Sequence, residues 1–143
     1  MKKRHKAVSV LLTAMMLFAS FEAFAANTFT AVSGSDWNTA ANWSEGVPVA
    51  GQAVVIDGDA TLTNATPALA SLTVNSGKTL TFDGWDTLLT ATTVTIDGTV
   101  THAQNTDTNA VDGWTPSARV NIACSTLEVT AGGKIDVNYR GYL

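Results

Sequence analysis

The sequence is poor in the side chains from which many active sites and metal sites are built. Its 143 residues include one cysteine and two histidines. A lone cysteine excludes an intrachain disulfide, and the apolar surroundings of Cys124 predict a small buried side chain. His5 lies in a segment that we expect to be removed, and His102 alone cannot supply a Ser–His–Asp triad or a zinc site. These absences predict a chain without catalysis.

Basic side chains are also scarce outside the N-terminus. Four of the eight Lys and Arg residues fall within residues 2–6, an almost wholly apolar run covers residues 7–21, and a short Ala-Phe-Ala sequence ends at Ala25. That order is typical of a secretory signal peptide, and the apolar run is shorter than the about 20 residues that a membrane-spanning helix needs. We therefore predict a signal peptide at residues 1–25, export by the general secretory route to the cell surface or the medium, and no membrane span after cleavage.

Loss of residues 1–25 removes four basic residues and one acid, which takes the formal charge from −4 to −7. Nucleic-acid binding needs a basic surface that follows the phosphates, so we exclude nucleic acid as a partner. The acidic surface is typical of a soluble exported protein. The cations that remain are scattered along the chain, at Lys78, Arg119, Lys134 and Arg140.

The mature part has no stretch with apolar residues at helical spacing. Short runs such as residues 93–96 instead alternate Thr with Val or Ile, which predicts strands with a wet and a dry face. Four segments repeat one pattern, in which an apolar-x-apolar strand is followed by a glycine-bearing turn and a second short strand. They are centred on strands that contain Val54, Leu72, Val94 and Leu127.

The spacing of these segments indicates how the strands are arranged. The steps are 18, 22 and 33 residues, and the longest contains a polar insertion at residues 104–117. A step near 20 residues is about one turn of a parallel β-solenoid, and such coils tolerate loops that leave and return. We predict an all-β fold with solenoid turns in residues 53–143. The alternative is an antiparallel β-sandwich, in which the Asp-Gly pairs at 57–58 and 97–98 are hairpin turns.

Residues 26–52 differ from the repeats. They contain Trp37, Trp43 and Pro48 in place of alternating strands. The end of a solenoid exposes apolar interior and unpaired strand edges, which must be covered for the protein to stay soluble. We predict that this segment is an N-terminal cap.

The run DWNTAANWSEGVPVAGQAVVI at residues 36–56, continued by SLTVNSGKTLTF at residues 71–82, resembles the opening of large bacterial secreted or surface right-handed parallel β-helix proteins. It is also similar to the start of G8-type domains. The resemblance covers residues 36–100 and, more loosely, the last strand pair. It implies a right-handed coil in a surface, adhesive or polysaccharide-associated setting. Proteins of this kind are usually much longer, so we expect a truncated chain whose open last turn can self-associate.

Exposed tryptophans are the candidate ligand-binding groups. Trp85 follows a strand and Trp114 lies in the insertion, and we predict that these two indoles stack on surface glycans. A pair of aspartates for glycoside hydrolysis is a weaker hypothesis, because most aspartates here stand beside glycine in turns, where Asp caps the local backbone.

The insertion alternates polar residues as the first half of a calcium loop does. This pattern predicts a weak calcium site, although the sharp-turn glycine and the bidentate glutamate of such a loop are missing, and a plain polar loop is the alternative. The candidate ligands are Asn105, Asp107, Asn109 and Asp112.

We expect an exported structural or adhesive β-helix protein of the cell surface or extracellular space, with no catalysis in this chain and no cofactor other than weakly bound calcium. Its expected partners are surface glycans or other surface proteins. A carbohydrate-binding or polysaccharide-processing module is the alternative.

Overall fold

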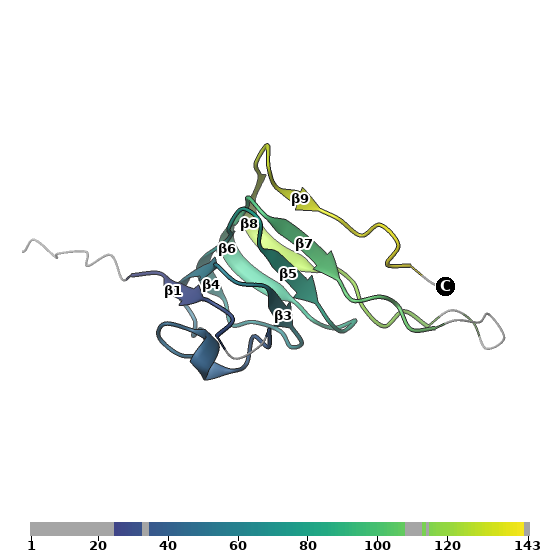
Figure 1. The fold of residues 1–143 in the computed structure, drawn as a ribbon, viewed down its shortest axis with the longest axis horizontal. Helices are drawn as coiled ribbons and strands as arrows, with labels where there is room; N and C mark the ends of the chain where they lie inside the picture. Colours follow the sequence, from purple (N-terminus) through teal and green to yellow (C-terminus); the bar gives the residue numbers. More distant parts are fainter. Residues whose placement is uncertain (1–24, 33–34, 108–112, 114, 142–143) are drawn as a thin grey trace, which may run out of the picture.

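The computed structural model describes residues 25–32, 35–107, 113 and 115–141 (Figure 1). All of the predicted signal peptide except Ala25 lies outside the described residues. Within those ranges the chain consists mainly of strands, with one 3-10 turn, η1, at Ala40–Asn42. None of its described helical segments is long and apolar enough to cross a membrane.

The strands form two parallel sheets. The first has the order β1-β2-β4-β6-β8, and the second has the order β3-β5-β7-β9. The bounds are β1 Asn27–Phe29, β2 Ala53–Ile56, β3 Ala60–Leu62, β4 Leu69–Val74, β5 Thr79–Phe82, β6 Leu89–Ile96, β7 Thr99–His102, β8 Ile122–Val129 and β9 Lys134–Ile135.

From β2 onward the chain alternates between the sheets, because β2, β4, β6 and β8 are each followed by a strand of the second sheet. We call each such pair of strands a layer. The four layers are the four strand-turn-strand segments that the sequence pattern predicted. Neighbouring strands pair in parallel in both sheets. The all-β prediction is therefore confirmed, with parallel sheets, and the antiparallel sandwich is wrong for these strands.

The Asp-Gly pairs at 57–58 and 97–98 link the two sheets and are not hairpin turns. Neither glycine has the positive φ that a tight Asp-Gly hairpin turn requires. The close stacking of the layers instead explains why a glycine is needed at position 98. A Cβ on Gly98 would collide with the carbonyl oxygens of Asn75 and Lys78 in the preceding layer.

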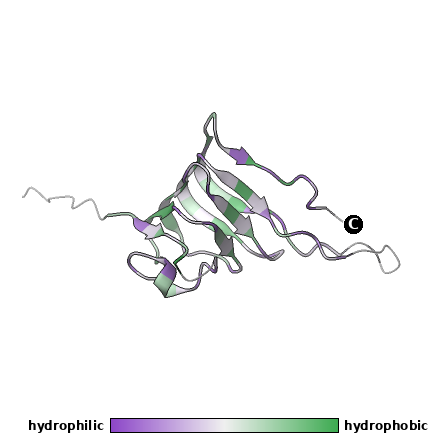
Figure 2. Cartoon of the chain, in the orientation of Figure 1, coloured by the Kyte–Doolittle hydropathy of each residue, from purple (hydrophilic) through white to green (hydrophobic). Residues whose placement is uncertain are grey.

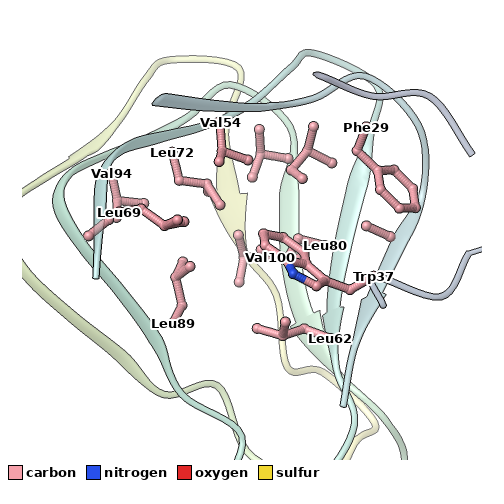
Figure 3. Packing of buried hydrophobic residues seen from close by; sticks show 14 of the residues in the cluster. Phe29, Trp37, Val54, Leu62, Leu69, Leu72, Leu80, Leu89, Val94 and Val100 are labelled. Carbon is pink, nitrogen blue, oxygen red and sulfur yellow. The ribbon is translucent and has the colours of Figure 1, made fainter. Parts of the chain in front are cut away.

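In-register pairing aligns the inward side chains into columns, and the two sheets bury these columns in one core except at their last members in β8 and β9 (Figure 3). Hydrophobic and hydrophilic residues alternate along the strands (Figure 2), as the sequence pattern predicted. Burial of each Val or Leu of this kind stabilises the fold by roughly 1.5–3 kcal/mol. In the first sheet one column runs Val54, Leu72, Val94 and Leu127, and in the second sheet one runs Ala60, Leu80, Val100 and Ile135.

The N-terminal end of the stack is covered by aromatic side chains. The Phe29 and Trp37 rings both lie edge-on to Trp43, with centroids 4.9 and 4.7 Å from it, and all three side chains are buried. The indole Nε1 of Trp43 donates to the Trp37 carbonyl at 2.6 Å, so its polar group is satisfied. β1 pairs with β2, and Asp36 bridges to Thr61, which extends both sheets by one strand position over the first layer.

At the other end of the stack, no described strand lies beyond β8 and β9 (Figure 1). Val94 and Val100 are fully buried, but their column partners one layer on, Leu127 and Ile135, are 45% and 42% exposed. Val129 and Val137 are similarly exposed. This end presents the apolar interior and the strand edges of β8 and β9.

His102 and Cys124 both lie on strands, and the predicted burial of Cys124 is only partial. His102 is the last residue of β7, is buried opposite Phe82, and lies with Nδ1 2.7 Å from the Ala103 carbonyl oxygen. Cys124 packs against the core but is only half-buried, because β8 belongs to the last described layer.

Candidate functional site

The first candidate, Trp85, is held at the surface by a single cation. Its side chain is 40% exposed. The Arg119 guanidinium carbon lies 4.3 Å from the centroid of the indole ring, and Arg119 Nε donates to the Trp85 carbonyl at 2.8 Å. Such a contact contributes about 0.5–1 kcal/mol at an exposed position. Trp114 lies outside the described residues, so the two predicted glycan-binding indoles cannot be placed together.

The candidate calcium ligands in the described part of the insertion make hydrogen bonds within the protein. Asn105 is buried, and its side-chain oxygen accepts from the Ser117 N–H at 2.7 Å, the Ser117 hydroxyl at 3.2 Å and the Ala118 N–H at 3.1 Å. Asp107 Oδ2 accepts from the Thr115 N–H at 2.7 Å. These bonds join the outgoing and returning arms of the loop.

Asn109 and Asp112 lie outside the described residues. Among residues 25–32, 35–107, 113 and 115–141, no three His, Cys, Asp or Glu side chains gather into a group that could hold a metal ion. Calcium binding by the insertion stays a prediction.

The turn aspartates cap neighbouring backbone or side chains. Asp57 Oδ1 accepts from the Asn75 amide at 3.0 Å, and Asp59 Oδ1 accepts from the Thr79 N–H at 2.9 Å. Both bonds connect one layer to the next, so these carboxylates stabilise the stacking of the turns. This is the capping role that the residue type favours in turns.

A groove of about 490 Å³ lies on the outer face of the second sheet. Its floor comes from β5 and β7, and its wall from β9 and the segment that follows it. Two of the four cations left outside the predicted signal peptide, Lys134 and Arg140, line this groove. The lining residues are Thr79, Thr99, Thr101, Lys134, Asp136, Asn138, Tyr139 and Arg140.

One carboxylate in this groove is fixed by two neighbours. The Asn138 backbone N–H donates to Asp136 Oδ1 at 3.1 Å, and Lys134 Nζ lies 3.1 Å from Asp136 Oδ2. The backbone hydrogen bond, followed by the bond from Lys134, lowers the pKa of Asp136 below its ordinary value of 3.8. The Lys134 charge is thereby paired, whereas no described residue pairs with the Arg140 guanidinium.

The sequence reasoning missed this groove. The signals that pointed to it were the Thr-x-Thr sequences at 79–81 and 99–101 and the two cations near the C-terminus. Only the in-register pairing of β5, β7 and β9 brings them to one face.

Comparison of the chain with protein-family models, with curated proteins and with solved structures finds no match.

Proposed function

We propose that the chain forms the cap and turns of an exported right-handed parallel β-helix with a structural or adhesive role at the cell surface or beyond it. The observation that carries this proposal is the in-register stack of two parallel sheets, capped by aromatic rings at one end and apolar at the other. A rigid stack of this kind presents extended flat faces, which suits a scaffold. In this proposal the chain itself catalyses nothing.

The export step is tested with the full chain in a bacterial host. Fractionation followed by N-terminal sequencing should find a mature protein that starts at Ala26 outside the cytoplasm. A chain that stays uncleaved in the membrane fraction would contradict the export proposal.

The open end is the proposed self-association surface. A second copy cannot stack on the N-terminal end without displacing β1 and the aromatic cap. The open end of one copy therefore meets the open end of another, which is a self-complementary contact and closes at a dimer. Sealing the edges of β8 and β9 in this way removes the exposed strand edges that otherwise promote aggregation.

Sedimentation velocity of the mature chain tests this contact. We expect a dimer that Val129→Glu converts to a monomer, because a charge would enter the apolar interface. Thr93→Glu is the matched control, since Thr93 faces outward one layer earlier and its substitution should leave the dimer intact. A monomeric wild-type chain, or equal effects of the two variants, would contradict the proposal.

A carbohydrate-binding module is the second candidate function, and the half-exposed indole of Trp85 favours it. Calorimetric titration with neutral and acidic oligosaccharides tests it. Binding that is lost in Trp85→Ala or Trp114→Ala would support the indoles as the stacking platform. Binding that survives both substitutions would place the ligand elsewhere on the protein.

A further inference from the structure

The floor of the groove on the second sheet is a ladder of threonine hydroxyls. Thr79 of β5 pairs in register with Thr99 of β7, which pairs with Lys134 of β9. Thr101 stands two residues beyond Thr99 on the same face of the sheet. None of these three threonine side chains hydrogen-bonds to another described residue. Thr79 and Thr99 are partly exposed, whereas Thr101 is only 5% exposed. The hydroxyls of Thr79 and Thr99 are therefore available to donate to, and accept from, a polar ligand.

The wall of the groove is anchored from the base of the insertion. The Asn105 backbone N–H and side-chain amide both donate to the Arg140 carbonyl, at 3.2 and 3.1 Å. Gln104 Nε2 donates to the Gly141 carbonyl, and the Arg140 N–H donates to the Val137 carbonyl at 3.2 Å. These bonds fix the backbone of Arg140 beside the groove and leave its guanidinium without a hydrogen-bond partner among the described residues.

An aromatic ring stands at the rim. Tyr139 is 97% exposed, and its φ of 56° lies in the left-handed region that bulky residues seldom adopt. Exposure of so large an apolar ring costs hydration free energy, and a ligand that covers it would recover that cost. The flat face of a phenol ring is suited to stacking on a sugar ring.

The charge of the groove selects the kind of sugar. Lys134 is paired with Asp136, which leaves Arg140 as the cation without a described partner. A guanidinium binds a carboxylate through two parallel hydrogen bonds, which adds both affinity and orientation. The groove holds two cations and one carboxylate, although the mature chain as a whole is acidic.

We propose that this groove binds a sugar that carries a carboxylate, such as a uronic acid residue of an extracellular glycan. Arg140 binds the carboxylate, the hydroxyls of Thr79 and Thr99 bind the sugar hydroxyls, and Tyr139 stacks on the ring. The volume of about 490 Å³ lies within the range of small-ligand sites and suits one or two sugar units. The inference rests on the carbohydrate-binding alternative, but it assigns a site other than the tryptophans.

The test compares two ligands that differ only in the carboxylate. The mature chain is titrated by calorimetry with a trigalacturonate and with the neutral trigalactose of the same linkage. We expect binding of the acidic sugar only, and a loss of about tenfold or more in affinity for Arg140→Ala, because the removed bonds are charge-assisted. Arg140→Lys should recover part of that loss, since it restores the charge but not the paired geometry.

Two further variants separate the groove from the Trp85 surface. Thr99→Val keeps the shape of the floor and removes one hydroxyl, so it should weaken binding while circular dichroism shows an unchanged fold. Arg119→Ala removes a cation that lies over Trp85 and does not line the groove, so it should leave the affinity unchanged.

Three results would overturn the proposal. Equal affinity for the neutral sugar would remove the role of the carboxylate. A loss of binding in Arg119→Ala or Trp85→Ala, without a loss in Arg140→Ala, would assign the sugar to the Trp85 surface and so support only the broader carbohydrate-binding function. The absence of binding to either sugar would reject the groove as a uronate site, while the scaffold proposal would still depend on the sedimentation result.

Discussion

The two ends of the stack differ in how far the apolar side chains are buried. At the N-terminal end, Phe29, Trp37 and Trp43 close over the first layer and are nearly inaccessible. At the C-terminal end, Leu127 and Ile135 continue the columns but remain almost half exposed. The comparison shows that burial in this fold depends on the presence of a next layer and not on the hydrophobicity of the residue itself.

The largest effect is expected from opening the capped end. Trp43→Ala should lower the free energy of unfolding by about 3–5 kcal/mol, since it empties the space between two other aromatic rings. Leu127→Ala should cost only about 1 kcal/mol, because its side chain is already partly in water. Urea denaturation of both variants measures the difference, with Val129→Glu used as a background to keep the chain monomeric. Equal costs would show that the two ends are equally covered in solution.

An intermediate effect on the free energy of unfolding is expected from substitution in the glycine pair between β8 and β9. A Cβ on Gly133 would collide with the carbonyl oxygen of Ile96, whereas a Cβ on Gly132 would meet the Asp97 carbonyl oxygen at an ordinary 3.7 Å. Gly133→Ala should therefore push the turn off the preceding layer, at a cost of about 1–3 kcal/mol. Faster amide exchange in β9, with β6 unaffected, is the expected readout.

Gly132→Ala is the matched control for that substitution. It adds the same methyl group one residue earlier, where there is room for it. Indistinguishable effects of the two alanines would mean that the last turn does not stack on the layer before it.

The smallest effect on stability is expected from protonation of the Asp136 carboxylate, which follows β9. Because the pKa of Asp136 is lowered in the fold, the unfolded chain takes up the proton first as the pH falls. Its contribution to stability is present above about pH 4 and is lost as the pH drops through the lowered folded pKa. Carbon NMR titration of the Asp136 side chain should give a pKa below 3.8.

Lys134→Gln tests which neighbour lowers the pKa of Asp136. It should return the pKa of Asp136 only part of the way, since the Asn138 backbone N–H remains the main cause of the shift. A full return to the ordinary value would mean that Lys134, and not the turn backbone, holds the carboxylate.

Several features of the fold could be predicted from local sequence patterns. The alternation of Thr with Val or Ile gave the strands, because a pleated strand places successive side chains on opposite faces. The repeated strand-turn-strand segments gave the layers, and Trp37 and Trp43 were expected in a cap and are buried there. Each of these follows from residues that are close together in the chain.

The candidate sites were harder to predict because they depend on neighbours from distant parts of the chain. The polar alternation that suggested a calcium loop places Asn105 in hydrogen bonds to the returning arm and to Arg140. Trp85 was expected at the surface and lies there, but its partner Arg119 comes from the far side of the insertion. The burial of His102 could not be predicted, because nothing local shows that its position continues an inward column.

The sequence by itself determined which residues form strands, which face of each strand is apolar and where the turns fall, since these depend on period-two alternation and on glycine. The tertiary structure decided that the strands pair in parallel in two sheets and that the Asp-Gly turns join those sheets. It also decided that threonines and two cations from four separate segments line one groove. The physical reason is that register and layer contacts join residues 18 to 35 positions apart. The local pattern favours a solenoid turn but leaves a hairpin open.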